Sequence, residues 1–411
     1  MKTLNRNWQF TVGGLQIMIA ILIANCQLPI ANCQTIPLDS VLSRIEKNNP
    51  SILSYQNKIL SANEMAKGVK SWMPPTLSLE FDSATVGISQ MIPNARKQNA
   101  KKDYLKSLAA LESNDASYLK NQFFAAAKTA YYERYIAERK SKVLKENLRL
   151  LQLILDISEL QIAYNKSDLP SVYRAQAKLN TQESMLTEEQ GMIDEATAAL
   201  NYMMNENLSN NFSIDTVIAL QKYTDQTPDT TKETLESKRS DIQKMNNSIN
   251  SMELNRKLTM AQAHPDFGVM VQRNNTYTNR HPFMLGLTMT VPILPWVSKE
   301  YKSEARAMDF QIDAMQQQKT GMMNMASRMV RMNLIKLRSN YHILDNYSEK
   351  IIPAYTKNFE VSLLAYQQNT GELLPVLMAW DDLQMAKLQY LDILETTLKT
   401  EAELEKELES N

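Results

Sequence analysis

The sequence predicts a mainly α-helical protein in which long antiparallel helices are combined with two short β-hairpins. Three observations lead to this fold class. Glycine and proline are scarce, with 9 and 14 among 411 residues, and residues that favour helix fill two long stretches without proline. Two shorter stretches alternate apolar with small or polar residues, as strands do. The second half of the chain repeats the order of elements found in the first half.

The first 33 residues are expected to be an export signal. Lys2 and Arg6 provide a positive start, and residues 15–24 form an apolar run that is too short to span a membrane as a helix. Small residues before the cleavage point would leave Gln34 as the first residue of the mature chain. The protein is therefore expected to leave the cytoplasm.

Both cysteines, Cys26 and Cys33, lie inside this signal. A mature chain without cysteine has no disulfide, thiolate metal site or catalytic thiol. Acylation of Cys26 or Cys33, as in a lipoprotein, is the alternative. However, Asn25 and Asn32 precede the two cysteines, where lipoprotein signals have Gly, Ala or Ser. No later stretch approaches about 18 consecutive apolar residues, so no transmembrane helix is expected.

Charge and motifs exclude several classes of function. The chain has 45 basic and 45 acidic side chains, and this zero net charge argues against a nucleic-acid partner. No nucleophile elbow, phosphate-binding loop or zinc motif occurs, which predicts a protein that is not an enzyme and holds no cofactor. His264, His281 and His342 are too scattered to share a metal ion.

The long helices dominate the expected architecture. The helices are expected at about 38–72, 94–164, 170–205, 231–263, 297–367 and 372–409. The first long one, from about Asn94 to Tyr164, would measure about 105 Å at 1.5 Å per residue. Pro353 is expected to bend the second. Because pairs of the shorter helices add up to one long helix, we expect a wall of two continuous and two composite antiparallel rods.

A methionine repeat marks one face of the second long helix. Its members are Met308, Met315, Met322 and Met329, with Met325 and Met332 at the intervening positions. A strict seven-residue repeat predicts the seam of a left-handed coiled coil. Thioether sulfur also binds copper, so metal binding is the alternative, but methionine fills irregular seams well and packing is favoured.

Two β-hairpins interrupt the helices. Their strands are expected at residues 75–81 with 86–93, and at 266–272 with 284–292. Alternation suits a wall that is wet on one side and apolar on the other. Four strands cannot close a barrel, whereas three chains would supply twelve and remove every edge. The alternative is a pair of open caps on a coiled-coil rod. Strands of about eight residues are also short for a membrane span, which needs roughly 9–11.

The two halves of the chain resemble each other. Residues 49–52 precede the first hairpin, and residues 239–242 precede the second. An offset of 204 then aligns the later turns and helices, pairing Asn165 with Asn369 and Val172 with Val376. This duplication predicts a pseudo-sixfold wall in a trimer.

Taken together, these residues resemble the TolC-type outer membrane efflux proteins, and among them the branch that serves heavy-metal (cobalt-zinc-cadmium and copper) cation exporters. The motifs are Gly87–Pro93, Pro265–Phe267, Gly286–Pro292 and the two turns with their following helices. The resemblance covers essentially all of the expected mature chain. It implies a homotrimer with a twelve-stranded barrel in outer-membrane lipid and a helical tunnel in the periplasm.

The resemblance also implies the function and its partners. Such ducts dock onto an inner-membrane efflux pump through a periplasmic adaptor (membrane fusion) protein, and their cargo passes passively. The expected function is therefore export of metal cations or small toxic compounds. A periplasmic coiled-coil structural or metal-binding protein is the alternative.

The residues that carry this function are expected in the helical turns farthest from the membrane. The resemblance places adaptor docking at Tyr164, Asn165, Lys166, Ser167, Asp168, Asn369, Thr370, Gly371 and Glu372. Asn165 and Asn369 stand where the family has Gly, and Asn is the next-best residue at positive φ. The family narrows its tunnel with aspartate rings, whose matching positions here are Pro375 and Met378. Asp381 and Asp382 lie one turn further on, where three copies would attract cations.

These expectations divide the chain into eight parts. They are a signal peptide (1–33), a helical part (34–74), a hairpin (75–93), a long helix with its turn and return helix (94–205), a linker (206–230), a second helical part (231–264), a second hairpin (265–293) and a second long helix with its turn and return helix (294–411). Trp72 and Trp296 flank the two hairpins at equivalent places and are expected either at the membrane surface or in the hairpin–helix junction.

Overall fold

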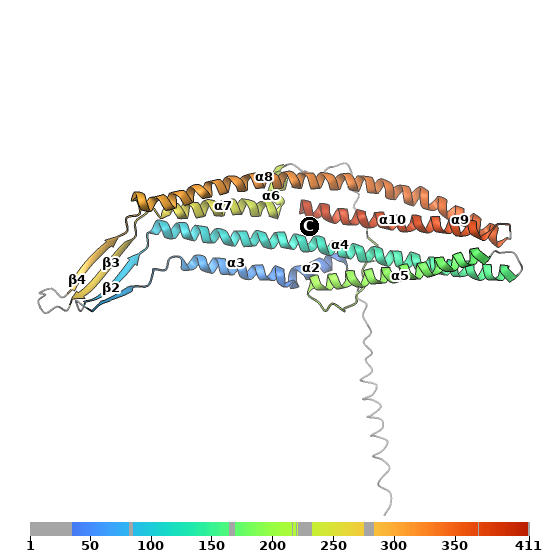
Figure 1. The fold of residues 1–411 in the computed structure, drawn as a ribbon, viewed down its shortest axis with the longest axis horizontal. Helices are drawn as coiled ribbons and strands as arrows, with labels where there is room; N and C mark the ends of the chain where they lie inside the picture. Colours follow the sequence, from blue (N-terminus) through green and yellow to red (C-terminus); the bar gives the residue numbers. More distant parts are fainter. Residues whose placement is uncertain are drawn as a thin grey trace, which may run out of the picture.

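The computed structural model describes residues 35–81, 85–163, 169–215, 217, 218, 220, 232–274, 283–368 and 370–409. These residues form one long rod, with the described strands at one end and the end of α4, the start of α5 and the turn between α9 and α10 at the other (Figure 1). The expected signal segment, with Cys26 and Cys33, lies outside the described residues. Among the described residues, no helix combines the length and the apolar character needed to cross a membrane.

The elements follow the expected order in both halves of the chain. The first half contains α2 (Leu38–Asn48), α3 (Pro50–Gly68), β1 (Thr76–Glu80), β2 (Thr85–Ile92), α4 (Ala95–Ala163) and α5 (Leu169–Met204). The second half contains α6 (Lys232–Lys238), α7 (Ser240–Ala261), β3 (Phe267–Asn274), β4 (Phe283–Met289), α8 (Pro295–Asn346), the π-helical turn η1 (Tyr347–Ile351), α9 (Ile352–Gln367) and α10 (Leu373–Leu408). The long helix expected from about Asn94 to Tyr164 is thus confirmed as α4.

Two of the expected shorter helices are each broken into two. Asn49 separates α2 from α3 with an extended backbone (φ −68°, ψ 118°), because the residue before a proline is forced out of the helical region. Its side chain then caps α3 by accepting the backbone N–H of Ser51 at 3.0 Å. Arg239, also extended (φ −73°, ψ 121°), separates α6 from α7 at the equivalent point of the second half.

The second long helix also differs from the expectation. It consists of α8 and α9 joined by η1, so the helix widens for one turn before Pro353. Proline has no N–H to donate, and a π-helical turn accommodates such a break without ending the rod. A bend was expected at Pro353, and the structure has a π-helical turn just before this residue.

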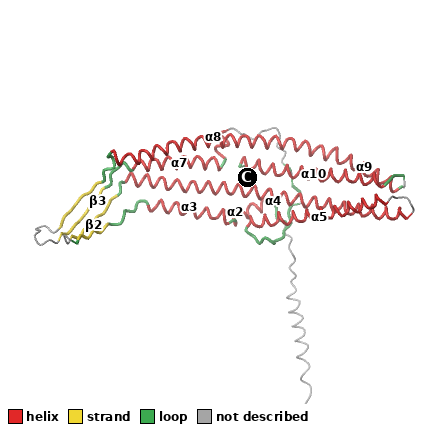
Figure 2. The backbone as a smooth tube through the Cα atoms, in the orientation of Figure 1, coloured by secondary structure: helices red, strands yellow, loops and turns green. Residues whose placement is uncertain are grey.

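The shorter helices complete the rods as expected. Figure 1 shows α3 and α5 following one another along α4, and α7 and α10 following one another along α8 and α9. The tube in Figure 2 shows the same two layers running the length of the helical part. The molecule is therefore built from two long rods and two composite rods.

The junctions inside the composite rods confirm the internal repeat. The side-chain amide of Asn49 donates a 2.9 Å hydrogen bond to the carbonyl of Met203, at the end of α5. In the second half, the Arg239 guanidinium donates to the carbonyl of Glu407, near the end of α10, at 2.9 Å. Thus the residue that breaks the first helix of each composite rod also contacts the end of the second.

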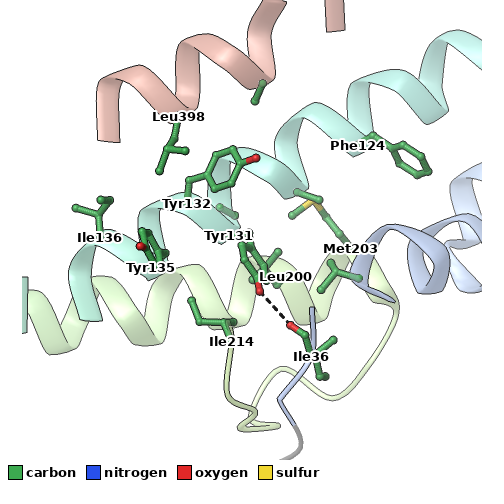
Figure 3. Close-up of a cluster of buried hydrophobic side chains, with 14 of the residues drawn as sticks. Ile36, Phe124, Tyr131, Tyr132, Tyr135, Ile136, Leu200, Met203, Ile214 and Leu398 are labelled. Carbon is green, nitrogen blue, oxygen red and sulfur yellow. Dashed lines mark hydrogen bonds between the residues drawn. The ribbon is translucent and has the colours of Figure 1, made fainter. Parts of the chain in front are cut away.

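The largest buried cluster lies midway along the rod, where α2, α4, α5 and α10 meet (Figure 3). Tyr131 of α4 is buried there and donates a 3.2 Å hydrogen bond to the carbonyl of Ile36. The same hydroxyl accepts the backbone N–H of Asp215 at 3.0 Å. Burial raises the pKa of Tyr131 to about 12, so the phenol stays protonated and ties the start of the described chain to the middle of the rod.

The methionine repeat is only partly a seam. Met308 is buried on α8, and Met315, Met322 and Met329 are half-buried, as expected for packing. The intervening buried positions are Ala326 and Asn333, and not the methionines that precede them. Met325 and Met332 are 58% and 41% exposed, so their expected place in the seam is wrong by one residue.

Candidate functional site

The strands of both hairpins form one antiparallel sheet in the order β1-β2-β3-β4. The two hairpins are joined by a pairing of β2 with β3, which was not predicted from the sequence. It places Ile88 opposite Val271 and Gly87 opposite Gln272. Sequence spacing could not give this pairing, because the strands come from opposite halves of the chain. β1 and β4 are the outer strands of the sheet, with no further strand beside them among the described residues.

One face of this sheet is mainly apolar, and the register of the described strands places only Gln90 and Arg273 among its apolar side chains. Directly opposite residues share a face, and the register therefore gathers the apolar side chains of all four strands. They are Leu77, Leu79, Val86, Ile88, Phe267, Val269, Val271, Phe283, Leu285, Leu287 and Met289, each between 40% and 87% exposed. We call these residues the apolar sheet face. So large an exposed patch is unusual for a protein surrounded only by water.

The opposite face combines small and polar residues with three methionines, Met91, Met270 and Met284. Ser78, Gly87 and Gln272 follow one another across three strands. A Cβ added to Gly87 would lie 2.6 Å from the Ser78 hydroxyl and 2.8 Å from Cγ of Gln272, so no larger residue fits there. The sheet thus has one mainly apolar side and one more polar side, as the alternating sequence predicts.

Asp266 fixes the sheet to the helical rods. Its carboxylate accepts the backbone N–H of Asn94 at 2.8 Å and forms an ion pair with Lys97 at 2.6 Å. Its backbone N–H donates to the hydroxyl of Thr290 at 2.8 Å, just after β4. Asp266 therefore joins the start of α4, which follows the first hairpin, to both ends of the second hairpin. Nearby, Trp72 and Trp296 are both exposed beside the sheet.

The helical turns lie at the opposite end of the rod (Figure 1). Of the expected docking residues, Tyr164, Asn165, Lys166, Ser167, Asp168 and Asn369 lie outside the described residues. Thr370, Gly371 and Glu372 are described and exposed. The Ala365 carbonyl accepts the backbone N–H groups of Thr370 and Gly371 at 2.9 and 3.1 Å, which closes the turn after α9.

A second buried cluster lies near this end of the rod. It joins α4, α5, α9 and α10 through residues that include Leu155, Val172, Tyr366, Val376 and Trp380. Inside it, the hydroxyls of Ser158 and Tyr366 lie 3.0 Å apart and are hydrogen-bonded. This contact joins α4 of the first helical hairpin to α9 of the second, and no local pattern of residues indicates it.

The expected gate residues fall on two faces of α10. Pro375, Met378 and Asp382 are exposed and form one stripe along the helix. Asp381 instead faces α5, where its carboxylate forms a 2.9 Å ion pair with Lys178. The structure therefore separates the two aspartates that were expected to act together. Lys178 was missed because the ion pair joins helices that are far apart in sequence.

Comparison with known proteins supports the same architecture. No family model and no curated protein matches the chain. Solved structures do match it. The outer-membrane channel OprN aligns with a TM-score of 0.76 at 12% identity, over 91% of this chain and 90% of that one. This chain has the fold of that outer-membrane channel.

Other channels give the same result. The CmeC outer-membrane channel of Campylobacter jejuni aligns with a TM-score of 0.75 at 14% identity, over 90% of this chain and 85% of that one. The outer membrane protein VceC of Vibrio cholerae aligns with a TM-score of 0.73 at 14% identity, over 90% and 95% of the two chains. The mainly helical fold with a small four-stranded sheet is thus shared along nearly the whole length of these proteins.

Proposed function

We propose that this chain is one subunit of an outer-membrane efflux channel, and that it conducts its cargo passively. The apolar sheet face is the observation that carries the proposal. A sheet with one mainly apolar and one more polar side, at the end of a helical rod, suits a wall between lipid and a water-filled bore. The shared fold with solved outer-membrane channels agrees with this assignment.

The channel would be a homotrimer. A membrane has no water to satisfy the free backbone groups of β1 and β4, so the outer strands need partners. Three copies of the four-stranded sheet would provide twelve strands and leave no free edge. Outer-membrane lipid would then contact the apolar sheet face, with Trp72 and Trp296 at its periplasmic border.

The helical part would extend through the periplasm and meet its partners at the turns. In this proposal, residues 164–168 and 369–372 dock onto a periplasmic adaptor protein, which links the channel to an inner-membrane pump. The pump would supply the energy, since a passive duct has no site for it. The exposure of Thr370, Gly371 and Glu372 at the far end of the rod supports this role.

The gate would lie beside these turns. Pro375, Met378 and Asp382 would face the bore, because they form the exposed stripe of α10. Asp381 would contribute less to the cation-attracting ring, since its charge is paired with Lys178. Opening would require α9 and α10 to move away from α4, which breaks the Ser158–Tyr366 hydrogen bond.

The cargo would be metal cations or small toxic compounds, with the heavy-metal branch as the closer sequence resemblance. In the described part of the chain, no three His, Cys, Asp or Glu side chains are placed to hold a metal ion together. In this proposal the pump selects the cargo and the channel provides the water-filled path.

Single-channel conductance of the purified protein in a planar lipid bilayer tests the proposal. We expect discrete conductance steps from a trimer that resists dissociation in detergent. The alternative, a periplasmic coiled-coil or metal-binding protein, predicts a water-soluble chain that never conducts. Recovery of the mature protein only in the soluble fraction would refute the channel.

A further inference from the structure

A cavity of about 310 Å³ lies between α4, α10 and the start of α9, away from the sheet and the turns. Its lining residues are Arg139, Lys142, Val143, Glu146, Ile352, Lys387, Tyr390 and Leu391. This volume is in the range of sites that hold small organic molecules. Nothing in the channel function described above uses these residues.

The cavity carries an excess of positive charge. Arg139, Lys142 and Lys387 contribute three cations, against the single carboxylate of Glu146. Among the described residues, none of these three cations forms an ion pair, and the Arg139 guanidinium lies over the ring of Tyr135, 5.2 Å from the ring centroid. Three cations from two helices against one carboxylate leave a net positive charge, which favours an anionic ligand.

In a neighbouring cavity between α4, α5 and α10, the lysines of the same helices are paired with carboxylates. There Lys140 forms an ion pair with Asp392 at 2.7 Å, and Lys399 forms one with Glu133 at 2.8 Å. In that cavity the lysines are neutralised by carboxylates on adjacent helices. The unpaired cations of the first cavity are therefore not a general property of α4 and α10.

The apolar side chains of the cavity wall indicate that the ligand also has an apolar part. Val143, Ile352 and Leu391 are apolar, and Tyr390 adds an aromatic ring. A purely inorganic anion would leave these surfaces uncovered, whereas an apolar body would bury them. The lining thus matches a molecule with one anionic group and one apolar part.

The position of the cavity suggests what binding would do. Ile352, in its wall, directly follows the π-helical turn η1, and its backbone N–H donates to the carbonyl of Tyr347. Single π-helical turns inside α-helices are frequent at functional sites. An anion held by Arg139 and Lys142 on one side and Lys387 on the other would bridge α4 and α10 next to this turn.

We propose that the cavity binds a small amphipathic organic anion, a carboxylate or sulfonate on an apolar body, and that the bound anion stabilises the packing of α10 on α4. The proposal is independent of channel function, since binding can be measured whether or not the protein conducts. A protein that conducts without binding the anion would refute the anion site alone, and one that binds the anion without conducting would refute the channel alone.

Titration calorimetry of the purified full-length mature protein in non-ionic detergent tests the site, with naphthalene-2-sulfonate as the probe. We expect one probe molecule per chain, and binding at least about tenfold weaker for the neutral isostere 2-naphthol, because the charge-assisted contacts are lost. The probe should also raise the melting temperature. Equal affinity for the two compounds, or uptake that scales with detergent concentration, would overturn the proposal.

Variants locate the binding. The double variant Arg139→Ala, Lys387→Ala is expected to weaken probe binding at least about tenfold. The control Lys145→Ala, Lys357→Ala removes two exposed cations of α4 and α9 outside the cavity and should bind like the wild type. Unchanged binding in the first variant, or equal loss in both, would contradict the site. If the first variant does not fold, the affinities of the wild type for naphthalene-2-sulfonate and 2-naphthol still test whether the site prefers an anion.

A carboxylate from a neighbouring copy of the chain is the competing occupant. It predicts that the assembled trimer does not bind the probe and that dissociated chains do. That result would also overturn the proposal.

Discussion

The hydroxyl of Tyr366 on α9 lies 3.0 Å from the hydroxyl of Ser158 on α4, and both side chains are almost completely buried. Ser158 itself donates to the carbonyl of Ile154 at 2.6 Å, so Tyr366 is the donor in the contact between the helices. This hydrogen bond is one of the polar contacts between the two helical hairpins, and an outward movement of the second hairpin tip would have to break it.

Tyr366→Phe removes this donor and keeps the ring. We expect a loss of stability of about 1 kcal/mol, the usual net value of a buried hydrogen bond. We also expect the open state to be more populated, seen as a larger mean conductance in planar bilayers. Ser158→Ala combined with Tyr366→Phe should cost less than the sum of the single changes. An open-state population unchanged by Tyr366→Phe would contradict a role in gating.

The two neighbouring aspartates of α10 should behave differently. Asp382 is exposed on the stripe with Met378, whereas Asp381 is paired with Lys178. Asp382→Asn is therefore expected to lower the preference for cations, measured as the reversal potential across a salt gradient. Asp381→Asn should change it less and should cost at most about 1 kcal/mol in stability, as exposed ion pairs do. The reverse order of effects would show that Asp381 faces the bore.

The apolar sheet face should be required for membrane insertion. Leu285→Asp places a carboxylate on this face of β4, whereas Met284→Asp places one on the opposite face of the same strand. Both side chains are exposed in the single chain, so neither change disturbs a core. We expect Leu285→Asp to reduce the amount of trimer recovered from outer membranes, and Met284→Asp to reduce it much less. Equal recovery of the two variants would argue against lipid on this face.

Much of the fold could be predicted because its signals are local. The absence of glycine and proline between residues 94 and 169 is enough to place α4. The break at Asn49 also has a local signal, since Asn before Pro is a typical helix boundary, but the break at Arg239 has none. The prediction that Met325 and Met332 lie in the seam was wrong because methionines occur on more than one face of α8. The buried position next to Met325 is taken by Ala326.

The contacts of the candidate site could not be predicted from the sequence. The pairing of β2 with β3, the ion pair of Lys178 with Asp381 and the contact of Ser158 with Tyr366 all join segments from different halves of the chain. Such contacts are set by how the rods pack, and no local pattern of residues encodes them. The duplication could place the halves side by side, but could not give the register between them.

Acylation of Cys26 or Cys33 would be hard to reconcile with a membrane at the strand end. Ile36 is buried at mid-rod, where its backbone N–H donates to Ser213 at 2.8 Å. From there α2 and α3, of 11 and 19 residues, lead towards the sheet (Figure 1), a distance of about 45 Å at 1.5 Å per residue. The nine residues from Cys26 to Thr35 reach at most about 32 Å when fully extended.

We therefore expect a mature chain that begins at Gln34 and carries no lipid. The intact mass of the protein purified from membranes should match residues 34–411 without a diacylglyceryl group. Cys26→Ser and Cys33→Ser should both reach the outer membrane in normal amounts. A mass increment of a diacylglyceryl group on either cysteine would show that the expectation is wrong.

Glu401 should make stability depend on pH. Burial in α10 raises the pKa of its carboxyl group from its ordinary value near 4.5 to about 7, although the Tyr341 hydroxyl, which donates to it at 2.6 Å, favours the charged form. A raised pKa means that the folded protein binds this proton more tightly than the unfolded chain. The folded state should therefore lose stability as the pH rises from about 4.5 to about 7, by up to about 3 kcal/mol from this group.

Glu401→Gln removes the titration and keeps an acceptor for Tyr341. Denaturation at pH 5 and pH 8 should show that the variant gains stability relative to the wild type at the higher pH. Tyr341→Phe is the matched test of the cause. Loss of its hydrogen bond removes an interaction that lowers the pKa, so the pH window of the effect should move upward. If the difference in stability between Glu401→Gln and the wild type is the same at both pH values, Glu401 does not titrate in this range in the folded protein.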